Sequence, residues 1–423
     1  MNNFYTLRNS LIIIPIQILF AFLAWNSVLY ISDDETAIVK AGSVDLGNLL
    51  LFHFRIFEIA ATKISYYYLD TAWLYISFIF FAATLFISAK ISKEIFKDLH
   101  NVHLFQIIIL CSASPFLAQS LSQIDTVSQV SGTFFAIITF YFSIKNEENK
   151  YNNLIVTLSS ILALASKELF LLMPLFAFFV VLKKSISNGK ITLKEQVNLI
   201  MLIFCVLFYL YVRNLNGGIG SLESLNTEHR YGIKSDFLAL AQNFFFTIGS
   251  IFNIVPTSLI GLKYGKIVYI FFALFFSIPL VVIAIKHFFH EANSRVTLYF
   301  MWLLCIATPL IFIHAAELYV YPLYFMLVLP LISRFRYKTI YLALPLVLCS
   351  LFNIFLLNNF RNFLVDDQNQ MKAAYIFTLF READYSLYTF YPEEWFLGEN
   401  LSDAYSHVAN VSDNQKRYGQ NTK

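Results

Sequence analysis

Three consecutive acids, Asp33, Asp34 and Glu35, directly follow the first long apolar segment of the chain. A carboxylate at a membrane face is half desolvated, and neighbouring carboxylates resist ionising together, which suits one of them for proton abstraction. Asp34 is the first candidate for such a base and Asp33 the second. A structural interpretation is also open, because Ser32 and Glu35 have the spacing of a capping box that begins a helix along the membrane surface. The two roles can coexist if Glu35 closes the cap.

A second charged motif, Ser166-Lys167-Glu168, separates the apolar runs Asn153–Ala165 and Leu169–Leu182. Each run has about 14 residues, or roughly 21 Å of helix, against a hydrocarbon core of about 30 Å. The turn is therefore expected to lie below the outer membrane surface. Charges at that depth need a cavity, water or partners, and they mark a functional site by default. Alternatively, Lys167 and Glu168 snorkel from a slightly longer hairpin.

Further polar candidates stand near the ends of other apolar runs. His314 and Glu317 are three residues apart and would share one face of a helix. They can equally form a polar cap beside an aromatic belt of nearby tyrosines. Asp125 precedes an apolar run, where an acid also simply complements the helix dipole. Its functional interpretation depends on the other charged groups predicted on the same membrane face.

The loop Asn214–Asp236 and the residue before it carry Arg213 and Arg230. Such a loop can supply the cation that a phosphate leaving group requires. It can also be a plain solvated linker, because the pair Gly217-Gly218 favours a flexible turn.

Composition predicts an all-α, multi-spanning membrane protein. Of the 423 residues, 58% are hydrophobic and only 13% are charged, and apolar runs of about 18 residues or more recur. The four cysteines form no disulfide or metal spacing, and neither a phosphate-binding loop nor a dinucleotide fingerprint occurs. Nothing indicates a nucleic-acid partner. We expect about eleven membrane helices, at 11–31, 71–89, 102–119, 126–144, 153–166, 169–182, 196–213, 267–285, 296–313, 318–333 and 339–357.

The distribution of lysine and arginine between the loops predicts the orientation of the helices. With the N-terminus inside, the inner loops hold Arg8, Lys90, Lys93, Lys97, Lys145, Lys150, Lys183, Lys184, Lys190, Lys194, Lys286, Arg295, Arg334, Arg336 and Lys338. The apolar stretch Phe237–Val255 is placed on or dipping into the outer face, since a full span would move two basic clusters outward. The chain then divides into a membrane domain, 1–357, and an outer-face tail, 358–423.

At these motifs the chain resembles the C-type glycosyltransferase (GT-C) superfamily, whose multi-spanning enzymes include protein O-mannosyltransferases and lipid A aminoarabinose transferases. That family has an acid pair after helix one, in an outer loop built of juxtamembrane helices; Asp33-Asp34-Glu35 and the loop Thr36–Asp70 are similar. One branch has Ser-Lys-Glu followed by a proline, which resembles Ser166-Lys167-Glu168 and Pro174. The motif Glu317-Leu318-Tyr319 resembles a Glu-Arg-Tyr motif, with Leu318 in the place of the arginine.

The resemblance implies inverting transfer of a sugar from a polyprenyl-phosphate donor to a hydroxyl acceptor on a glycolipid, polysaccharide or protein. The base would be Asp34 or Asp33, and Lys167 and Arg230, with Arg213 as a weaker candidate, would hold the phosphate. Glu35, Asp125, Glu168, His314 and Glu317 would complete the substrate site. Metal dependence stays open, without a ligand set to name. The expected location is a bacterial inner membrane, with the active face periplasmic. A surface-polysaccharide polymerase or ligase is the alternative, and a lipid or glycan transporter a more distant one.

Overall fold

A computed structural model describes residues 55–67, 73–96, 126–145, 151–187, 189, 191–215, 234, 236–252, 275, 277–291, 295–313 and 317–335. Most of these residues are helical, and there is no strand among them. The predicted helices at 11–31, 102–119 and 339–357 and the tail 358–423 lie outside the described residues. The described part therefore tests the fold class, and the count of eleven helices remains a prediction.

Four helical segments are long and apolar enough to cross a membrane. They belong to α5 (Trp73–Ile95), α8 (Val127–Ile144), α11 (Leu193–Leu215), and α10 (Met173–Ser187) together with the 3-10 turn η1 (Glu168–Phe170) before it. A helix of 20 residues is about 30 Å long, which matches the thickness of a hydrocarbon core. The chain thus has the composition and helix lengths of a multi-pass membrane protein.

The other helices are shorter, and most are equally apolar. They are α4 (Ile56–Tyr67), α9 (Asn152–Ser166), α12 (Phe237–Ile251), α14 (Ile278–Glu291), α15 (Val296–Phe312), the 3-10 turn η4 (Glu317–Val320) and α16 (Tyr321–Phe335). The helices predicted at 126–144, 153–166, 296–313 and 318–333 are found within a few residues of their expected bounds. The segment predicted at 169–182 begins instead as a 3-10 turn and continues to Ser187.

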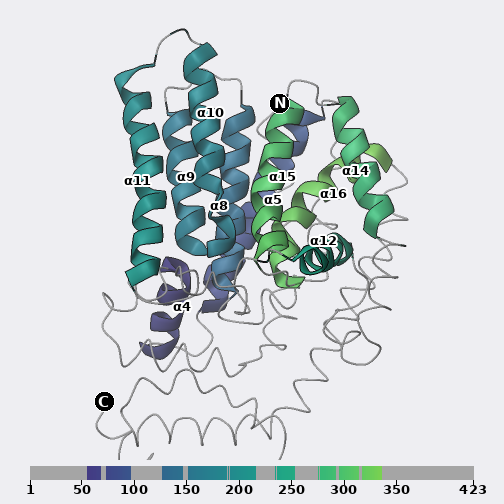
Figure 1. Cartoon of the computed structure of the whole chain (residues 1–423), viewed down its shortest axis with the longest axis horizontal. Coiled ribbons are helices and arrows are strands. Elements are labelled where there is room, and N and C mark those ends of the chain that lie inside the picture. The colour runs from purple at the N-terminus through teal and green to yellow at the C-terminus, as the bar shows by residue number, and fades with distance from the viewer. Residues whose placement is uncertain are drawn as a thin grey trace, which may run out of the picture.

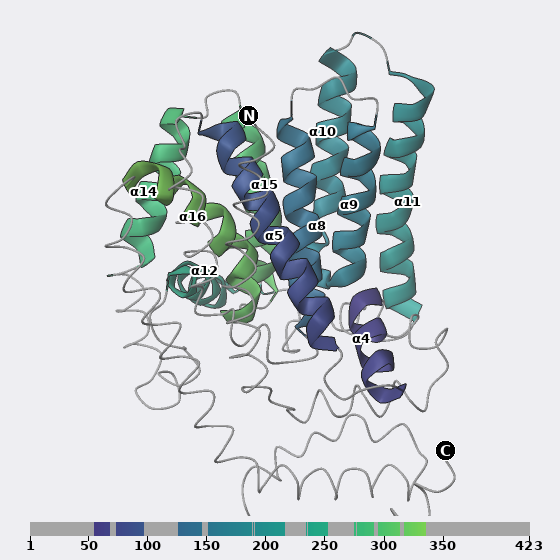
Figure 2. The same cartoon turned by 180° about the vertical axis from the view of Figure 1, so that it is seen from behind.

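Helices α8, α9, α10 and α11 run alternately up and down, side by side (Figures 1 and 2). This alternation brings the loop cations together at one end of the helices, which we call the basic end. Its described members are Lys90, Lys93, Lys145, Lys183, Lys184, Lys194, Lys286, Arg295 and Arg334. We call the opposite end, where α4 and the turn between α9 and α10 lie, the turn end. The basic end holds the loops that the sequence predicts to be inside.

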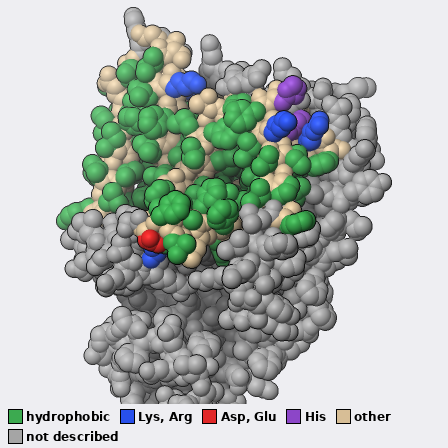
Figure 3. All heavy atoms as spheres, turned by 45° about the vertical axis from the view of Figure 1, so that its right-hand side comes forward, with side chains coloured by type: hydrophobic (Ala, Val, Ile, Leu, Met, Phe, Trp, Pro, Cys, Tyr) green, Lys and Arg blue, Asp and Glu red, His purple; other side chains and the backbone are tan. Residues whose placement is uncertain are grey.

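The two ends are joined by a close-packed interior and an apolar exterior. In α16, every residue from Tyr321 to Ile332 is buried, so this helix forms the centre of the fold. In α11, by contrast, large apolar side chains such as Ile200 and Phe204 are about two-thirds exposed, at 65% and 64%. Figure 3 shows a surface in which hydrophobic side chains cover the middle of the described helices. An apolar exterior of this kind fits an environment of lipid.

Small residues let α8 and α9 approach closely. The hydroxyls of Thr139 and Ser159 lie 2.8 Å apart across the interface, and both side chains are buried. Each hydroxyl also lies within hydrogen-bond distance of a carbonyl of its own helix, Phe135 for Thr139 and Ile155 for Ser159. Since a hydroxyl has one hydrogen, one of the two can donate across the interface while the other donates to its own helix. Because the hydroxyl groups of small polar residues find hydrogen-bond partners within the helix pair, these residues can line helix interfaces without water.

Helix α12 crosses the others at the turn end, where Figure 1 shows it end-on. Asp236 begins it by accepting a hydrogen bond from the Ala239 amide at 3.0 Å. The Asn243 side chain donates to the Ile311 carbonyl at 2.9 Å, and therefore ties α12 to the end of α15. The sequence placed this stretch at the outer face, and the structure places it at the end opposite the basic loops.

Candidate functional site

The candidate site is built on the turn between α9 and η1. Lys167 has extended backbone angles, φ −157° and ψ 147°, which end α9. Its amide donates to the Ala163 carbonyl at 3.3 Å, and its carbonyl accepts from the Phe170 amide at 3.0 Å. Pro174 is the second residue of α10, where a missing N–H costs little because first-turn amides have no intrahelical partner. The motif therefore stops one helix and starts the next.

Gly132 allows η1 to lie directly on α8. Phe170 is fully buried, and its ring occupies the space that a side chain at position 132 would need. A Cβ at Gly132 would lie 2.2 Å from Phe170 Cε2, well inside contact distance. The absence of a side chain at this position thus sets how closely the turn approaches α8.

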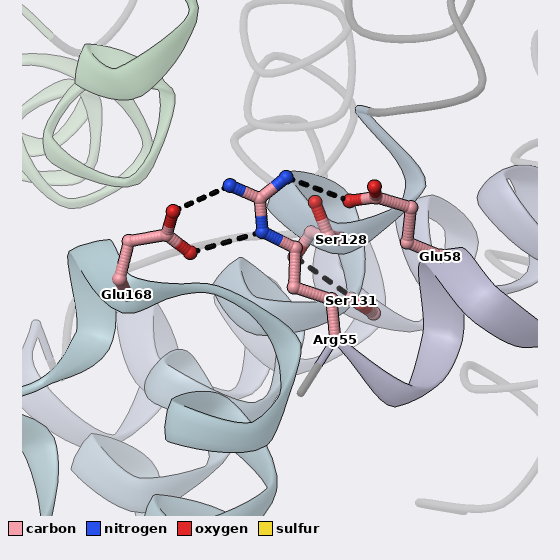
Figure 4. A network of polar contacts seen from close by, with 5 residues as sticks. All are labelled: Arg55, Glu58, Ser128, Ser131 and Glu168. Atoms are coloured by element: carbon pink, nitrogen blue, oxygen red, sulfur yellow. Dashed lines mark hydrogen bonds and ion pairs between the residues drawn. The ribbon is translucent and has the colours of Figure 1, made fainter. Parts of the chain in front are cut away.

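Arg55 connects α4 to the turn through a bidentate ion pair with Glu168 (Figure 4). Its Nε donates to Glu168 Oε2 at 3.0 Å, its Nη2 donates to Glu168 Oε1, and its Nη1 donates to Glu58 Oε2 at 3.0 Å. The side chains of Arg55 and Glu58 are 10% and 9% exposed, and that of Glu168 is 27% exposed. Two-point contact fixes the Glu168 carboxylate in position as well as neutralising it.

The Arg55 guanidinium is a permanent cation in this setting. Burial by itself would lower the pKa of Arg55, but the carboxylates of Glu168 and Glu58 outweigh it and hold the pKa well above its ordinary value. Ser128 and Ser131, in the first turns of α8, belong to the same polar region (Figure 4), and the Ser131 hydroxyl donates to the Ser128 carbonyl at 3.2 Å. These small side chains leave room for the guanidinium beside α8.

Lys167 turns toward η4 from the same stretch. Its Nζ lies 4.6 Å from the centre of the Tyr319 ring, and the residue is only 3% exposed. An aromatic face attracts an ammonium group without neutralising its charge. We refer to Arg55, Glu58, Lys167, Glu168 and Tyr319 together as the turn cluster. It joins three parts of the chain and holds two cations beside two carboxylates.

A buried amide lies near the turn cluster. Gln129, in the first turn of α8, is fully buried, and in the described structure neither its amide oxygen nor its nitrogen has a hydrogen-bond partner. It lies two helical turns before Ala136, whose carbonyl accepts from Trp302 Nε1 at 2.9 Å. Gly132, which contacts η1, lies three residues after Gln129, in the next turn of the same helix. An unsatisfied buried amide is costly and calls for an explanation.

The structure brings two of the predicted site residues, Lys167 and Glu168, into one cluster. Glu317 is the first residue of η4 and Arg213 lies near the end of α11, and the structure describes the backbone but not the side chains of these two. The remaining candidates lie outside the described residues, namely Asp33, Asp34, Glu35, Asp125, Arg230 and His314. In the described part of the chain, no group of three or more His, Cys, Asp or Glu residues could hold a metal ion.

Arg55 and Glu58 were missed by the sequence reasoning. The available indication was a charged pair inside the stretch Leu49–Ala61, which is otherwise apolar except for His53, with the (i, i+3) spacing of one helical face. Arg55 also lies in the predicted outer loop Thr36–Asp70, where positive charge is less expected than in the inner loops. Its partner Glu168 could not have been found in this way, because it lies 113 residues further along the chain.

Comparisons with family models, with curated proteins and with solved structures give no match to this chain. Function must therefore be inferred from the residues at the turn end and from their geometry.

Proposed function

We propose that the protein is a membrane glycosyltransferase of the GT-C type, which moves a sugar from a polyprenyl-phosphate donor to a hydroxyl acceptor. The observation that carries the proposal is the burial of Lys167 at the turn end, against Tyr319 and opposite the basic end. Burying a charged lysine at the end of apolar helices costs free energy. Ionisable residues within membrane segments commonly mark substrate sites.

Lys167 would bind the lipid phosphate. The leaving group of the reaction carries negative charge that grows as the bond to the anomeric carbon breaks, and a fixed cation stabilises that charge in the transition state. Lysine acts on phosphate as a point charge. The neighbouring Glu168 is itself paired through both carboxylate oxygens with Arg55.

Glu168 would orient the sugar. Each carboxylate oxygen has lone pairs for more than one hydrogen bond, so a carboxylate held by Arg55 can still accept from sugar hydroxyls. Glu58 shares the same arginine at 3.0 Å and so helps to fix its direction. In this scheme Arg55 is a positioning residue, and Glu168 contacts the substrate.

The acceptor hydroxyl needs a base, because it is a poor nucleophile at neutral pH. Asp34 is the first candidate and Asp33 the second, with Glu35, Asp125, Arg230, Arg213, His314 and Glu317 as further substrate contacts. The reaction would take place at the outer face of a bacterial inner membrane, since the turn end lies opposite the loops that positive charge places inside.

A transfer assay tests the proposal. Purified protein in lipid nanodiscs is mixed with radiolabelled polyprenyl-phosphate hexose or pentose and a membrane extract, and labelled product is counted. We expect product with the native chain, and a loss of about 10²–10⁴-fold in rate for Asp34→Asn, as for a missing general base. Glu35→Gln should be milder, because glutamine can complete the capping box.

Two results would redirect the proposal. Near-normal rates for Asp33→Asn, Asp34→Asn and Glu35→Gln together would move the base elsewhere, with Asp125 the next candidate. Transfer of a whole glycan from a polyprenyl diphosphate, without transfer from any monophosphate sugar, would identify the alternative polymerase or ligase.

A further inference from the structure

A cluster of basic side chains lies on the outer surface of the fold at the basic end of α14 and α16. Lys286 and His290 are exposed in the last turns of α14, and Arg334 is exposed in the last turn of α16. Figure 3 shows lysine or arginine and histidine side chains gathered at this end of the apolar surface. We call Lys286, His290 and Arg334 the basic patch.

Two contacts hold the helices of the patch together. The ring of His287 lies parallel to that of Phe96, at the end of α5, with 5.9 Å between the ring centres. His287 Nε2 and Ser333 Oγ are 3.2 Å apart, which fixes α14 against α16. Lys286 precedes His287 and Arg334 follows Ser333, so the two permanent cations flank this contact.

Among the side chains that the structure describes, no carboxylate forms an ion pair with a member of the basic patch. The acid at the end of α5, Glu94, is engaged by Arg295 at 3.0 Å. Within the described residues, neither Lys286 nor Arg334 forms an ion pair. Arg334 emerges at the point where the buried α16 leaves the core, so its charge faces outward.

An apolar face continues directly from these cations along α14. Val282 and Phe289 are 55% and 51% exposed, and they share the helical face of Lys286 and His290 at spacings of three, four and eight residues. On a membrane helix, such a face meets acyl chains, and cations at its end lie at the level of the lipid headgroups.

We infer that the basic patch binds the phosphate headgroup of an anionic phospholipid in the inner leaflet. The Arg334 guanidinium can hold two phosphate oxygens, and Lys286 adds a second positive charge. A lipid is favoured over free phosphate, because the exposed apolar face beside the cations provides a surface for the acyl chain. This inference is independent of the proposed glycosyl transfer at the opposite end.

Native mass spectrometry of the intact chain in detergent tests the inference, with phosphatidylglycerol or phosphatidylcholine added at equal concentration. The test variant is Lys286→Gln with Arg334→Gln. The matched control is Lys183→Gln with Lys194→Gln, which removes two exposed cations at the same end but on α10 and α11. A third protein, Lys286→Arg with Arg334→Lys, keeps the charge.

We expect the test variant to lose phosphatidylglycerol adducts at least about tenfold, the worth of one lost charge-assisted hydrogen bond, while the control and the charge-swapped protein keep them. Phosphatidylcholine binding should not change in any variant. Equal adduct loss in the test and control variants would show a general electrostatic effect and overturn the inference. Unchanged adducts in the test variant, or displacement by inorganic phosphate at matched concentration, would overturn it as well.

Discussion

Arg55 and Glu168 form a bidentate ion pair that links α4 to the turn between α9 and α10 across 113 residues of sequence. Glu58 binds the same guanidinium from within α4. Removing the arginine would leave two carboxylates without their counter-charge in a largely buried setting, whereas removing one acid leaves the other pair intact.

Arg55→Met is therefore expected to destabilise the protein more than Glu168→Gln. Loss of one partner of a buried ion pair lowers the free energy of unfolding by about 3–5 kcal/mol. Because Glu168 is partly exposed and solvent screens its charge, the expected loss lies at or below the lower end of that range. The double variant Arg55→Met with Glu168→Gln should recover part of the loss. Thermal unfolding in detergent, followed by circular dichroism, measures all three. Additive losses in the double variant would contradict direct coupling between the two residues.

Gly132→Ala should disturb the turn without changing any charge. The new methyl group would meet the Phe170 ring at 2.2 Å, and relief of such overpacking typically costs about 1–3 kcal/mol. We expect a lower unfolding temperature and reduced sugar transfer. The pair Gly132→Ala with Phe170→Leu should regain stability relative to Gly132→Ala alone, with Phe170→Leu by itself as the control. A Gly132→Ala protein as stable as the native chain would mean that the ring moves aside freely.

Gln129→Leu should separate stability from function. Replacing an unsatisfied buried amide by an apolar side chain of similar size removes a penalty of about 1–3 kcal/mol, so the unfolding temperature is expected to rise. If the amide contacts sugar hydroxyls of the proposed substrate, transfer should fall at least about tenfold, the equivalent of one lost hydrogen bond. Thermal unfolding and the transfer assay are read on the same preparation. A clear loss of stability would instead show that the amide has a structural partner, such as a bound water.

The orientation of the fold can be tested by labelling single cysteines. We expect a cysteine at Asp236, at the turn end, to react with an impermeant maleimide in intact cells or spheroplasts, in a background with the native cysteines replaced. A cysteine at Lys194, at the basic end, should react only after permeabilisation, because positive loops stay inside. The reverse pattern would place the turn cluster on the inner face and remove the outer-face reaction from the proposal.

Helix positions were largely predictable from the sequence, because hydrophobic length and loop charge are local properties. The predicted bounds of α8 and α15 differ from the structure by at most one residue, and the apolar runs on either side of Lys167 give the position of the turn. The start of α10 was less predictable. Extended backbone at Lys167 and the 3-10 turn Glu168–Phe170 depend on packing of Phe170 against Gly132, which no local pattern reveals.

The candidate site was predictable only in part. The sequence predicts a Lys167–Glu168 turn below the membrane surface from two flanking runs of about 14 residues, but the segment after the turn, Glu168–Ser187, has 20 residues. The depth in the membrane stays a prediction, whereas the structure shows that Lys167 is buried in the protein, at 3% exposure. The partners of the two residues, Arg55 and Tyr319, come from distant parts of the chain. Such pairings depend on how the helices pack in three dimensions, and sequence spacing carries no information about them.

Single-turnover transfer by a Lys167→Met protein tests the central claim most directly. Methionine keeps the length and apolar stem of the side chain but removes its charge, so the fold should be retained and only phosphate stabilisation lost. The matched control is Lys183→Met, at the basic end, and unfolding temperatures are recorded for both. We predict that Lys167→Met slows transfer from polyprenyl-phosphate sugar by about 10²–10³-fold, the usual cost of a lost oxyanion contact, while Lys183→Met transfers at the native rate. An undiminished rate in a folded Lys167→Met protein would contradict the account.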